Sequence, residues 1–272
     1  MTTELNQKPN ENIDIALAQR IVDHWKLVIS EAELRTEPYD HFHIDQAFPE
    51  DVYEMILENK ISSEHFHAFN LKRWKRSDGT STRDTMFLCE DSFEEFDDVR
   101  QKFWLTLTYA LNSDILRQLV YKKMKADVAL RLGVGEEDIL NSDGYISSVL
   151  IRDSEGYRIK PHPDGQPRVA TLAFYLPEDN SQADLGTSVY TDRGKLAGVV
   201  GKRFKEVYRF PFTRNSLAVF AVNDFPHRKS LHGRELVTAK GERNLIILSF
   251  NSETQQVKSF ENQVPQTHNG LS

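Results

Sequence analysis

Three residues of the kinds that bind transition metals stand out in this sequence, as a close pair and a distant third member. His162 and Asp164 lie two positions apart in the segment 160–164, and His232 follows some seventy residues later. The two prolines of this segment favour an extended backbone, because a residue that precedes proline avoids helical angles. Side chains two positions apart in an extended segment project to the same side. Two histidines and one carboxylate on one face are the ligand set that holds ferrous iron with coordination positions left open. The three residues therefore predict a catalytic iron site.

The third ligand of this set has one competitor. His227 lies five residues before His232, and the sequence alone leaves it as an alternative ligand. Other histidines also occur in pairs that would share a face of an extended segment, but they lie in the N-terminal part, where we expect structural roles. These pairs are His41 with His43 and His65 with His67.

An arginine at the start of an apolar run is the second part of the candidate site. Arg243 directly precedes the segment 244–250, which is apolar enough to form a core strand. An unpaired charge at the entrance of such a strand is costly, whereas the guanidinium fork can meet a carboxylate with two hydrogen bonds. The pattern predicts that Arg243 binds a carboxylate of a ligand; the alternative is an arginine at a strand end that faces water.

The elements that position these residues change character near residue 140. Apolar residues at helical spacing predict helices over 13–28, 49–60 and 114–131, the last of which stops at Gly133. Ser92 and Glu95 match a capping box, which predicts a long helix from there through Leu111. Short runs rich in β-branched and aromatic residues then predict strands at 145–152, 168–176, 187–190, 204–212, 216–222 and 244–250. Several short strands at such spacing are typical of a sandwich or jelly roll.

The chain is expected to form one functional unit. A length of 272 residues allows a substantial core, and it fits one domain with elaborations better than two equal domains. We expect a disordered N-terminus over 1–12, a helical part with substrate-site loops over 13–140, a β core over 141–251, and a flexible tail over 252–272.

Composition excludes several classes of function. Hydrophobic residues make up 39% of the chain, and no apolar run approaches membrane-spanning length. The polar start carries no signal region, and the single Cys89 excludes an intrachain disulfide, so we expect a reducing cytoplasm. A net charge of −7 gives no reason to expect a nucleic-acid partner. The oligomeric state is not predicted.

Residues 145–251 resemble the double-stranded β-helix of the Fe(II)/2-oxoglutarate-dependent dioxygenase superfamily, particularly its prolyl-hydroxylase-like branch. The matching residues are His162-Pro163-Asp164, Ala173-Phe174-Tyr175-Leu176, Gly186-Thr187, His232-Gly233 and Glu242-Arg243 ahead of 244–250. The resemblance implies an α+β protein with a jelly-roll, cupin-like core on which the helical N-terminal part packs. It also implies Fe(II), the cosubstrate 2-oxoglutarate and O2, with His162, Asp164 and His232 as the iron ligands.

The same resemblance suggests where the cosubstrate binds. In this family an arginine about ten residues after the last histidine binds the distal carboxylate of 2-oxoglutarate, and here Arg243 follows after eleven. Tyr175 is similar to a family tyrosine that helps to bind this carboxylate; the alternative is a core aromatic residue. Gly186-Thr187 stands where a Gly-Gly pair is common, which is a departure from the protein-prolyl hydroxylases. Position 164 carries an aspartate and not a glycine, which leaves no vacant coordination position for a halide. The resemblance therefore favours hydroxylation or desaturation over halogenation.

The resemblance implies an oxygenase that hydroxylates or desaturates a C–H bond and releases succinate and CO2. We expect a small-molecule substrate that contacts the irregular segments 69–84, 152–160 and 192–205. Candidate substrate residues, each with a surface role as the alternative, are Arg73, Trp74, Arg83, Arg158 and Arg203. Two other functions stay open: a hydroxylase of protein side chains of the prolyl-hydroxylase type, and a non-catalytic jelly-roll binding module.

Charge along the chain is compatible with an anionic substrate. Between Arg193 and Arg234 the sequence has ten Lys or Arg residues and only two acidic ones. Such a run is either a solvated loop or a source of positive potential at the mouth of the site.

Overall fold

The computed structural model describes residues 11–69, 71–194, 203–237 and 242–252. The predicted disordered start and loose tail fall mainly on residues 1–10 and 253–272, which lie outside this part. The α-helices are α1 (Ile15–Glu31), α2 (Glu50–Glu58), α3 (Asp98–Leu111), α4 (Asp114–Lys123) and α5 (Lys125–Leu132). Short 3-10 helices are η1 (Ser63–His65), η2 (Lys72–Trp74), η3 (Glu90–Phe93), η4 (Ile139–Asn141) and η5 (Ala183–Leu185). No helix among the described residues is both long and apolar enough to cross a membrane.

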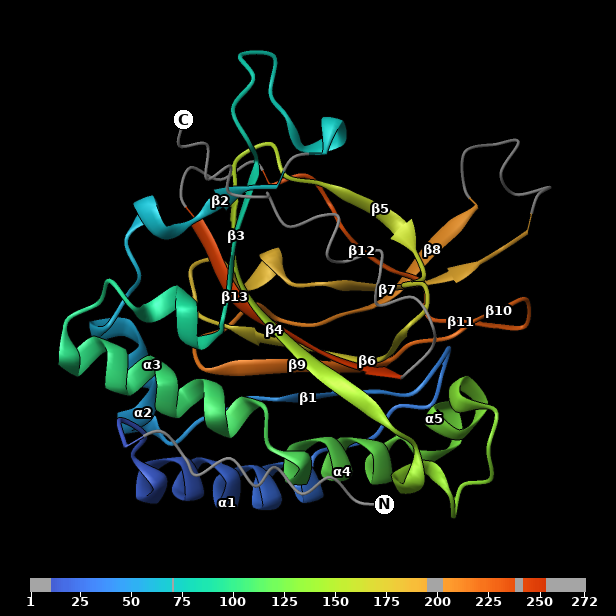
Figure 1. Ribbon diagram of the computed structural model, residues 1–272. Helices are drawn as coiled ribbons and strands as arrows, with labels where there is room; N and C mark the ends of the chain where they lie inside the picture. Colours follow the sequence, from blue (N-terminus) through green and yellow to red (C-terminus); the bar gives the residue numbers. More distant parts are fainter. Residues whose placement is uncertain (1–10, 70, 195–202, 238–241, 253–272) are drawn as a thin grey trace, which may run out of the picture.

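Two antiparallel sheets face each other in the β core (Figure 1). The larger sheet has the order β1 (His41–Ile44), β9 (Ser216–Ala221), β6 (Arg168–Tyr175), β13 (Glu242–Ser252), β4 (Gly144–Ser154), β3 (Arg83–Phe87) and β2 (His67–Ala68). The smaller sheet has the order β5 (Ile159–His162), β12 (His232–Arg234), β7 (Ser188–Asp192) and β8 (Phe204–Arg209). A hairpin of β10 (Asp224–Phe225) and β11 (Arg228–Lys229) precedes β12. Strands from the N-terminal part thus join both edges of the larger sheet.

The central strands of the larger sheet are buried on both faces. Side chains alternate between the faces of a strand, so in β6 Leu172 and Phe174 belong to one apolar cluster while Ala173 and Tyr175 belong to another. The first cluster includes residues of the helices, and the second lies between the two sheets. Because both faces are buried, the sequences of these strands are almost continuously apolar. Every second side chain of such a strand points into the space between the two sheets.

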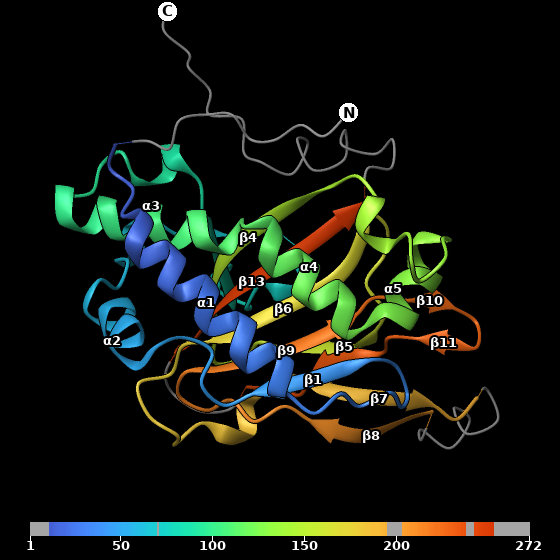
Figure 2. The same cartoon turned by 90° about the horizontal axis from the view of Figure 1, so that it is seen from below.

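The helices cover the outer face of the larger sheet. Figure 2 shows α1, α3 and α4 lying across this face. Helix α1 begins after Asp14, whose side chain accepts a hydrogen bond from the Leu17 N–H. Its Ile21 and Trp25 are buried in the first apolar cluster, which also contains residues of the larger sheet. The prediction of a β core with a helical N-terminal part packed on it is therefore confirmed.

Local signals predicted the strands better than the helix ends. All six predicted strands are present, and the helix that ends at Gly133 has the expected left-handed residue there, with φ of 71°. The capping box at Ser92 was wrong. Helix α3 starts at Asp98 and is capped by Asp97, because Phe93 is drawn into the core against Trp104 and the segment before Asp97 forms η3 instead. The predicted helix 114–131 is also divided, at Met124, into α4 and α5.

Gly186 occupies a position that no larger residue can take without moving the backbone. A Cβ atom there would lie 1.5 Å from the carbonyl oxygen of Phe210. We expect Gly186→Ala to lower the free energy of unfolding by about 1–3 kcal/mol, the usual cost of overpacking, as measured by denaturant titration. Gly165→Ala is the matched control, since a Cβ atom at that position would have nothing within 4 Å of it. Equal stability of the two variants would contradict this prediction.

Candidate active site

The metal-ligand candidates come together at one edge of the smaller sheet. His162 ends β5 and His232 begins β12, and these two residues are direct partners in the antiparallel register. Nε2 of His162 lies 3.7 Å from Oδ1 of Asp164, and Nε2 of His232 lies 3.7 Å from Oδ2. One ligand atom from each of the three residues lies within 4.8 Å of the others. In the part of the chain that the structure describes, no other group of three His, Cys, Asp or Glu residues is arranged in this way.

Both imidazole rings are oriented so that their Nε2 atoms face the carboxylate of Asp164. Nδ1 of His162 lies 2.9 Å from the carbonyl oxygen of Lys160, and Nδ1 of His232 lies 3.0 Å from that of Ser230. An Nδ1–H that donates to a backbone carbonyl leaves the Nε2 lone pair for a metal, which is the usual arrangement of histidine ligands. Two such nitrogens and a carboxylate fit ferrous iron. The competitor His227 is exposed and lies in the turn between β10 and β11, away from this group.

Asp164 is held in its charged form. Its Oδ2 accepts hydrogen bonds from Arg168, at 2.8 Å, and from Thr171, at 3.3 Å. Burial of the carboxyl group works to raise its pKa, but the positive charge of Arg168, followed by those of the two histidines, holds the pKa of Asp164 well below its usual range. A carboxylate fixed in this way is ready to bind a cation.

A cavity of about 310 Å³ extends from this group between the two sheets. Its walls include inward-facing residues of β3, β4, β6 and β13, with Phe220 of β9, from the larger sheet, and residues of β5 and β12 from the smaller sheet. Arg243 has the same parity along β13 as Leu245, Ile247 and Ser249, so its side chain is on the inner face. The cavity is of the size that takes small molecules.

Arg243 is buried at the end of this cavity and is bound from two sides. Its Nε donates to the Leu185 carbonyl oxygen at 2.7 Å, and its Nη1 donates to Oδ2 of Asp153 at 2.8 Å. Asp153 is fully buried and also receives two hydrogen bonds from Arg83, at 2.6 and 2.9 Å. Burial disfavours the charged form of Arg83, yet the charge of Asp153 raises the pKa of Arg83 above its ordinary value. The three side chains lie in one row across β3, β4 and β13, because their residues are register partners.

Tyr175 lies behind the cavity wall at the same end. Its hydroxyl donates to Oγ1 of Thr187 and accepts from the Thr187 N–H, both at 3.0 Å. Its ring packs against Phe212, and the Arg243 guanidinium lies 5.4 Å from the ring centre. Thr187 lines the cavity whereas Tyr175 does not. At this end the lining residue is therefore Thr187 and not Tyr175, a detail that the sequence did not indicate.

Arg234 is one of the residues of this site that the sequence analysis missed, as it missed Arg168, Thr171 and Asp153. It is 4% exposed, lines the cavity, and has no hydrogen-bond acceptor among the described residues for its buried Nε and Nη1 atoms. Burial, together with the charges of Arg243 and Arg209, lowers the pKa of Arg234 to about 10. In the sequence it was counted only as one member of a basic run. The available signal was its place two residues after His232, which puts both side chains on one side of a strand.

Comparison with solved structures identifies this architecture. No family model matches the sequence, and no curated protein matches it either. JOX2, solved in complex with 2-oxoglutarate, iron and JA, is similar at 13% identity over 79% of this chain and 68% of that chain, with a TM-score of 0.50. The dioxygenase for auxin oxidation DAO1 from Arabidopsis thaliana, solved with 2-oxoglutarate, is similar at 11% identity over 88% and 89%, again with a TM-score of 0.50. The chain has the fold of the 2-oxoglutarate oxygenases.

Other proteins with this fold are also similar to the chain. A prolyl hydroxylase from Trichoplax adhaerens, solved with a peptide fragment of hypoxia inducible factor, shares 15% identity over 88% of this chain and 90% of that chain, with a TM-score of 0.48. The double-stranded β-helix predicted from residues 145–251 is thus confirmed.

Within this 2-oxoglutarate oxygenase fold, the predicted substrate residues lie in different places. Trp74 and Arg83 line the cavity, and Arg83 lies over the ring of Tyr157 at 4.1 Å from its centre. Arg158 is exposed, and Arg203 is exposed in an ion pair with Asp192; neither is among the described residues that line the cavity. The side chain of Arg73 and residues 195–202 of the basic segment lie outside the described part.

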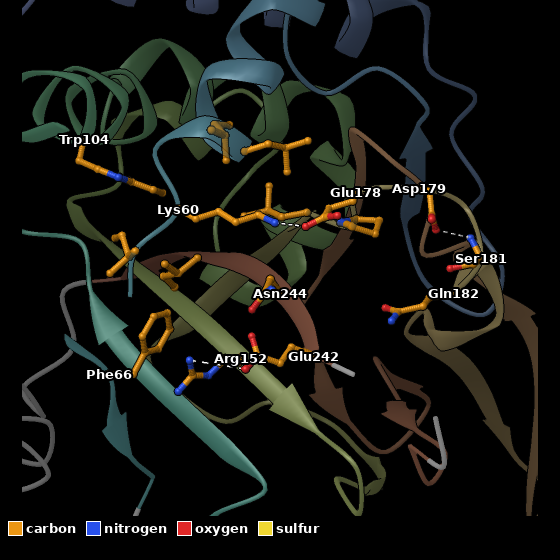
Figure 3. Close-up of a pocket in the computed structure, with 16 residues that line it drawn as sticks. Lys60, Phe66, Trp104, Arg152, Glu178, Asp179, Ser181, Gln182, Glu242 and Asn244 are labelled. Carbon is orange, nitrogen blue, oxygen red and sulfur yellow. Dashed lines mark hydrogen bonds and ion pairs between the residues drawn. The ribbon is translucent and has the colours of Figure 1, made fainter. Parts of the chain in front are cut away.

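A second cavity, of about 390 Å³, lies on the outer face of the larger sheet (Figure 3). Asn244 and Arg152 line it because they alternate along their strands with the inward-facing Arg243 and Asp153. Four of its charged groups pair with one another: Lys60 with Glu178, and Arg152 with Glu242 at 3.6 Å, while Asp179 accepts a hydrogen bond from the Ser181 N–H. It contains none of the candidate metal ligands, so the chemistry is assigned to the inner cavity.

Proposed function

We propose that this protein is an Fe(II)- and 2-oxoglutarate-dependent oxygenase that hydroxylates or desaturates a C–H bond of a small, anionic molecule, with release of succinate and CO2. The observation that carries the proposal is the convergence of His162, Asp164 and His232, with both Nε2 atoms turned toward one carboxylate at the mouth of an inner cavity. A binding module that had lost its chemistry would have no need for this set.

Each of the three side chains has a defined role. His162 and His232 would bind the metal through Nε2, kept in that tautomer by the carbonyl groups of Lys160 and Ser230. Asp164 would bind through an oxygen while Arg168 and Thr171 hold its orientation. When bound, ferrous iron supplies the activation of dioxygen that the side chains alone cannot provide.

Arg243 is the proposed anchor for the distal carboxylate of 2-oxoglutarate. It lies at the end of the cavity away from the metal ligands, beside the hydroxyl of Thr187, which Tyr175 holds in place. Because Asp153 is shared between Arg83 and Arg243, this end of the cavity keeps a surplus of positive charge. An aromatic wall that includes Trp74 is the proposed substrate side, and Arg83 lies between this wall and Asp153.

Metal and cosubstrate assays test the function directly. The purified protein should bind one Fe(II) or Mn(II) per chain and should convert 2-oxoglutarate to succinate slowly without substrate and faster with a suitable anionic one. Absence of both metal binding and succinate formation would leave the binding module as the better explanation. Turnover with peptides but not with small anions would favour the protein-hydroxylase alternative.

Replacing Arg243 with methionine should chiefly weaken 2-oxoglutarate binding. Loss of one charge-assisted hydrogen-bonded pair costs about 1.5–3 kcal/mol, so KM for 2-oxoglutarate should rise about 10- to 150-fold, with a smaller effect on kcat. The measurement is succinate formation as a function of 2-oxoglutarate concentration. Arg243→Lys is the matched control and should recover part of the affinity, since it keeps the charge. An unchanged KM in the methionine variant would mean that another residue binds this carboxylate.

A further inference from the structure

Among the described residues, Arg234 forms no ion pair, whereas the other arginines that line the cavity each pair with a carboxylate. Arg168 binds Asp164, and Arg83 and Arg243 share Asp153, whose two oxygens are both occupied. Arg234 is as buried as these groups, yet Nε and Nη1 of its guanidinium reach no acceptor among the described residues. A buried charge without a partner is strongly unfavourable. A ligand anion is therefore the missing partner.

The location of Arg234 indicates which part of a ligand would supply this anion. Arg234 follows Gly233, whose register partner on β7 is Ser188, so it lies opposite the Thr187 end of that strand. It lies two residues, or about 7 Å along the strand, beyond His232. Thr187 and Arg243 both line the cavity and both lie against Tyr175, so they belong to the same end of it. This end is where the proposed function puts the distal carboxylate.

We propose that Arg234 is a second binding residue for the distal carboxylate of 2-oxoglutarate, which lies between Arg234 of the smaller sheet and Arg243 of the larger one. This inference rests on the proposed function and deepens it. Arg243 is positioned by Asp153 and Leu185, so part of its hydrogen-bonding capacity is already used. Arg234 brings Nε and Nη1, which have no acceptor among the described residues. The two cations together select 2-oxo acids that carry a second carboxylate.

The test compares two 2-oxo acids of equal chain length. 2-Oxoglutarate has the distal carboxylate, and 2-oxopentanoate lacks it. Binding of each to the Mn(II)-loaded protein is measured by calorimetry for the wild type and for Arg234→Met. We expect the variant to lose at least about tenfold in affinity for 2-oxoglutarate, the effect of one charge-assisted pair, and to bind 2-oxopentanoate as the wild type does. Arg234→Lys should recover part of the difference.

A second variant keeps the proposal testable if Arg234→Met does not fold. In Arg243→Met, Arg234 is still present, so a preference of at least about tenfold for 2-oxoglutarate over 2-oxopentanoate should remain. Loss of that preference would show that Arg243 acts alone and would overturn the proposal. An unchanged preference in a folded Arg234→Met variant would overturn it as well, and would assign Arg234 to the substrate. If the Mn(II)-loaded wild type binds neither acid, the proposed function fails together with this inference.

Discussion

Replacing His162 with alanine should abolish the conversion of 2-oxoglutarate to succinate while leaving the fold intact. Nε2 of His162 would be one of three protein ligands, and His232 and Asp164 alone cannot complete the facial set. Even the hydrogen-bond partners of metal ligands cost 10- to 100-fold when removed, so loss of a ligand should cost more than about 100-fold. His162 is at the end of β5 and only partly buried, and the core clusters do not include it. Stability should therefore change little.

His227 provides the matched control for this experiment. It is an exposed histidine in the turn before β12, and the sequence left it as an alternative ligand. His227→Ala should keep wild-type activity and wild-type Fe(II) affinity, and Asp164→Ala should behave as His162→Ala does. Metal content after dialysis and the rate of succinate formation are the two measurements. Retained activity in both the His162 and Asp164 variants, or a loss confined to the His227 variant, would contradict the assignment.

The sequence revealed the metal-ligand candidates because two local rules suffice for them. Period-two alternation puts His162 and Asp164 on one side, and the ligand chemistry of iron asks for one more histidine. The sequence already favoured His232 over His227, and the register of β5 with β12 supports that choice because it places His232 opposite His162. The fold class was also predictable from local sequence, because strands that are buried on both faces appear in the sequence as short apolar runs.

The charges around the cosubstrate end could not be predicted from the sequence. Asp153 lies at the end of a predicted strand, and nothing local shows that it neutralises arginines from positions 83 and 243. Arg234 belongs to a strand of three residues with a register shift, so its burial depends on neighbours far away in the chain. Tyr175 was identified through resemblance, but its contact with Thr187 depends on how β6 and β7 approach each other.

Replacing Asp153 with asparagine should cause the largest loss of stability of any single change in this cavity. Asp153 is fully buried and is the common partner of Arg83 and Arg243. Asparagine keeps the shape but removes the charge, so the guanidinium groups of Arg83 and Arg243 would lose the negative charge that compensates them. Breaking a buried pair of this kind costs about 3–5 kcal/mol. The free energy of unfolding from denaturant titration, measured without ligand, checks the expected decrease.

Two further variants separate the charge effect from a general effect of substitution. Asp192→Asn removes one side of the exposed pair with Arg203 and should leave stability nearly unchanged, since water screens that pair. Arg83→Met added to Asp153→Asn removes one uncompensated cation, so the double variant should be more stable than the sum of the two single losses predicts. Strictly additive losses would mean that Asp153 stabilises the fold through packing. A positive coupling would show instead that this one carboxylate allows the 2-oxoglutarate oxygenase fold to keep its arginines buried at the end of the cavity.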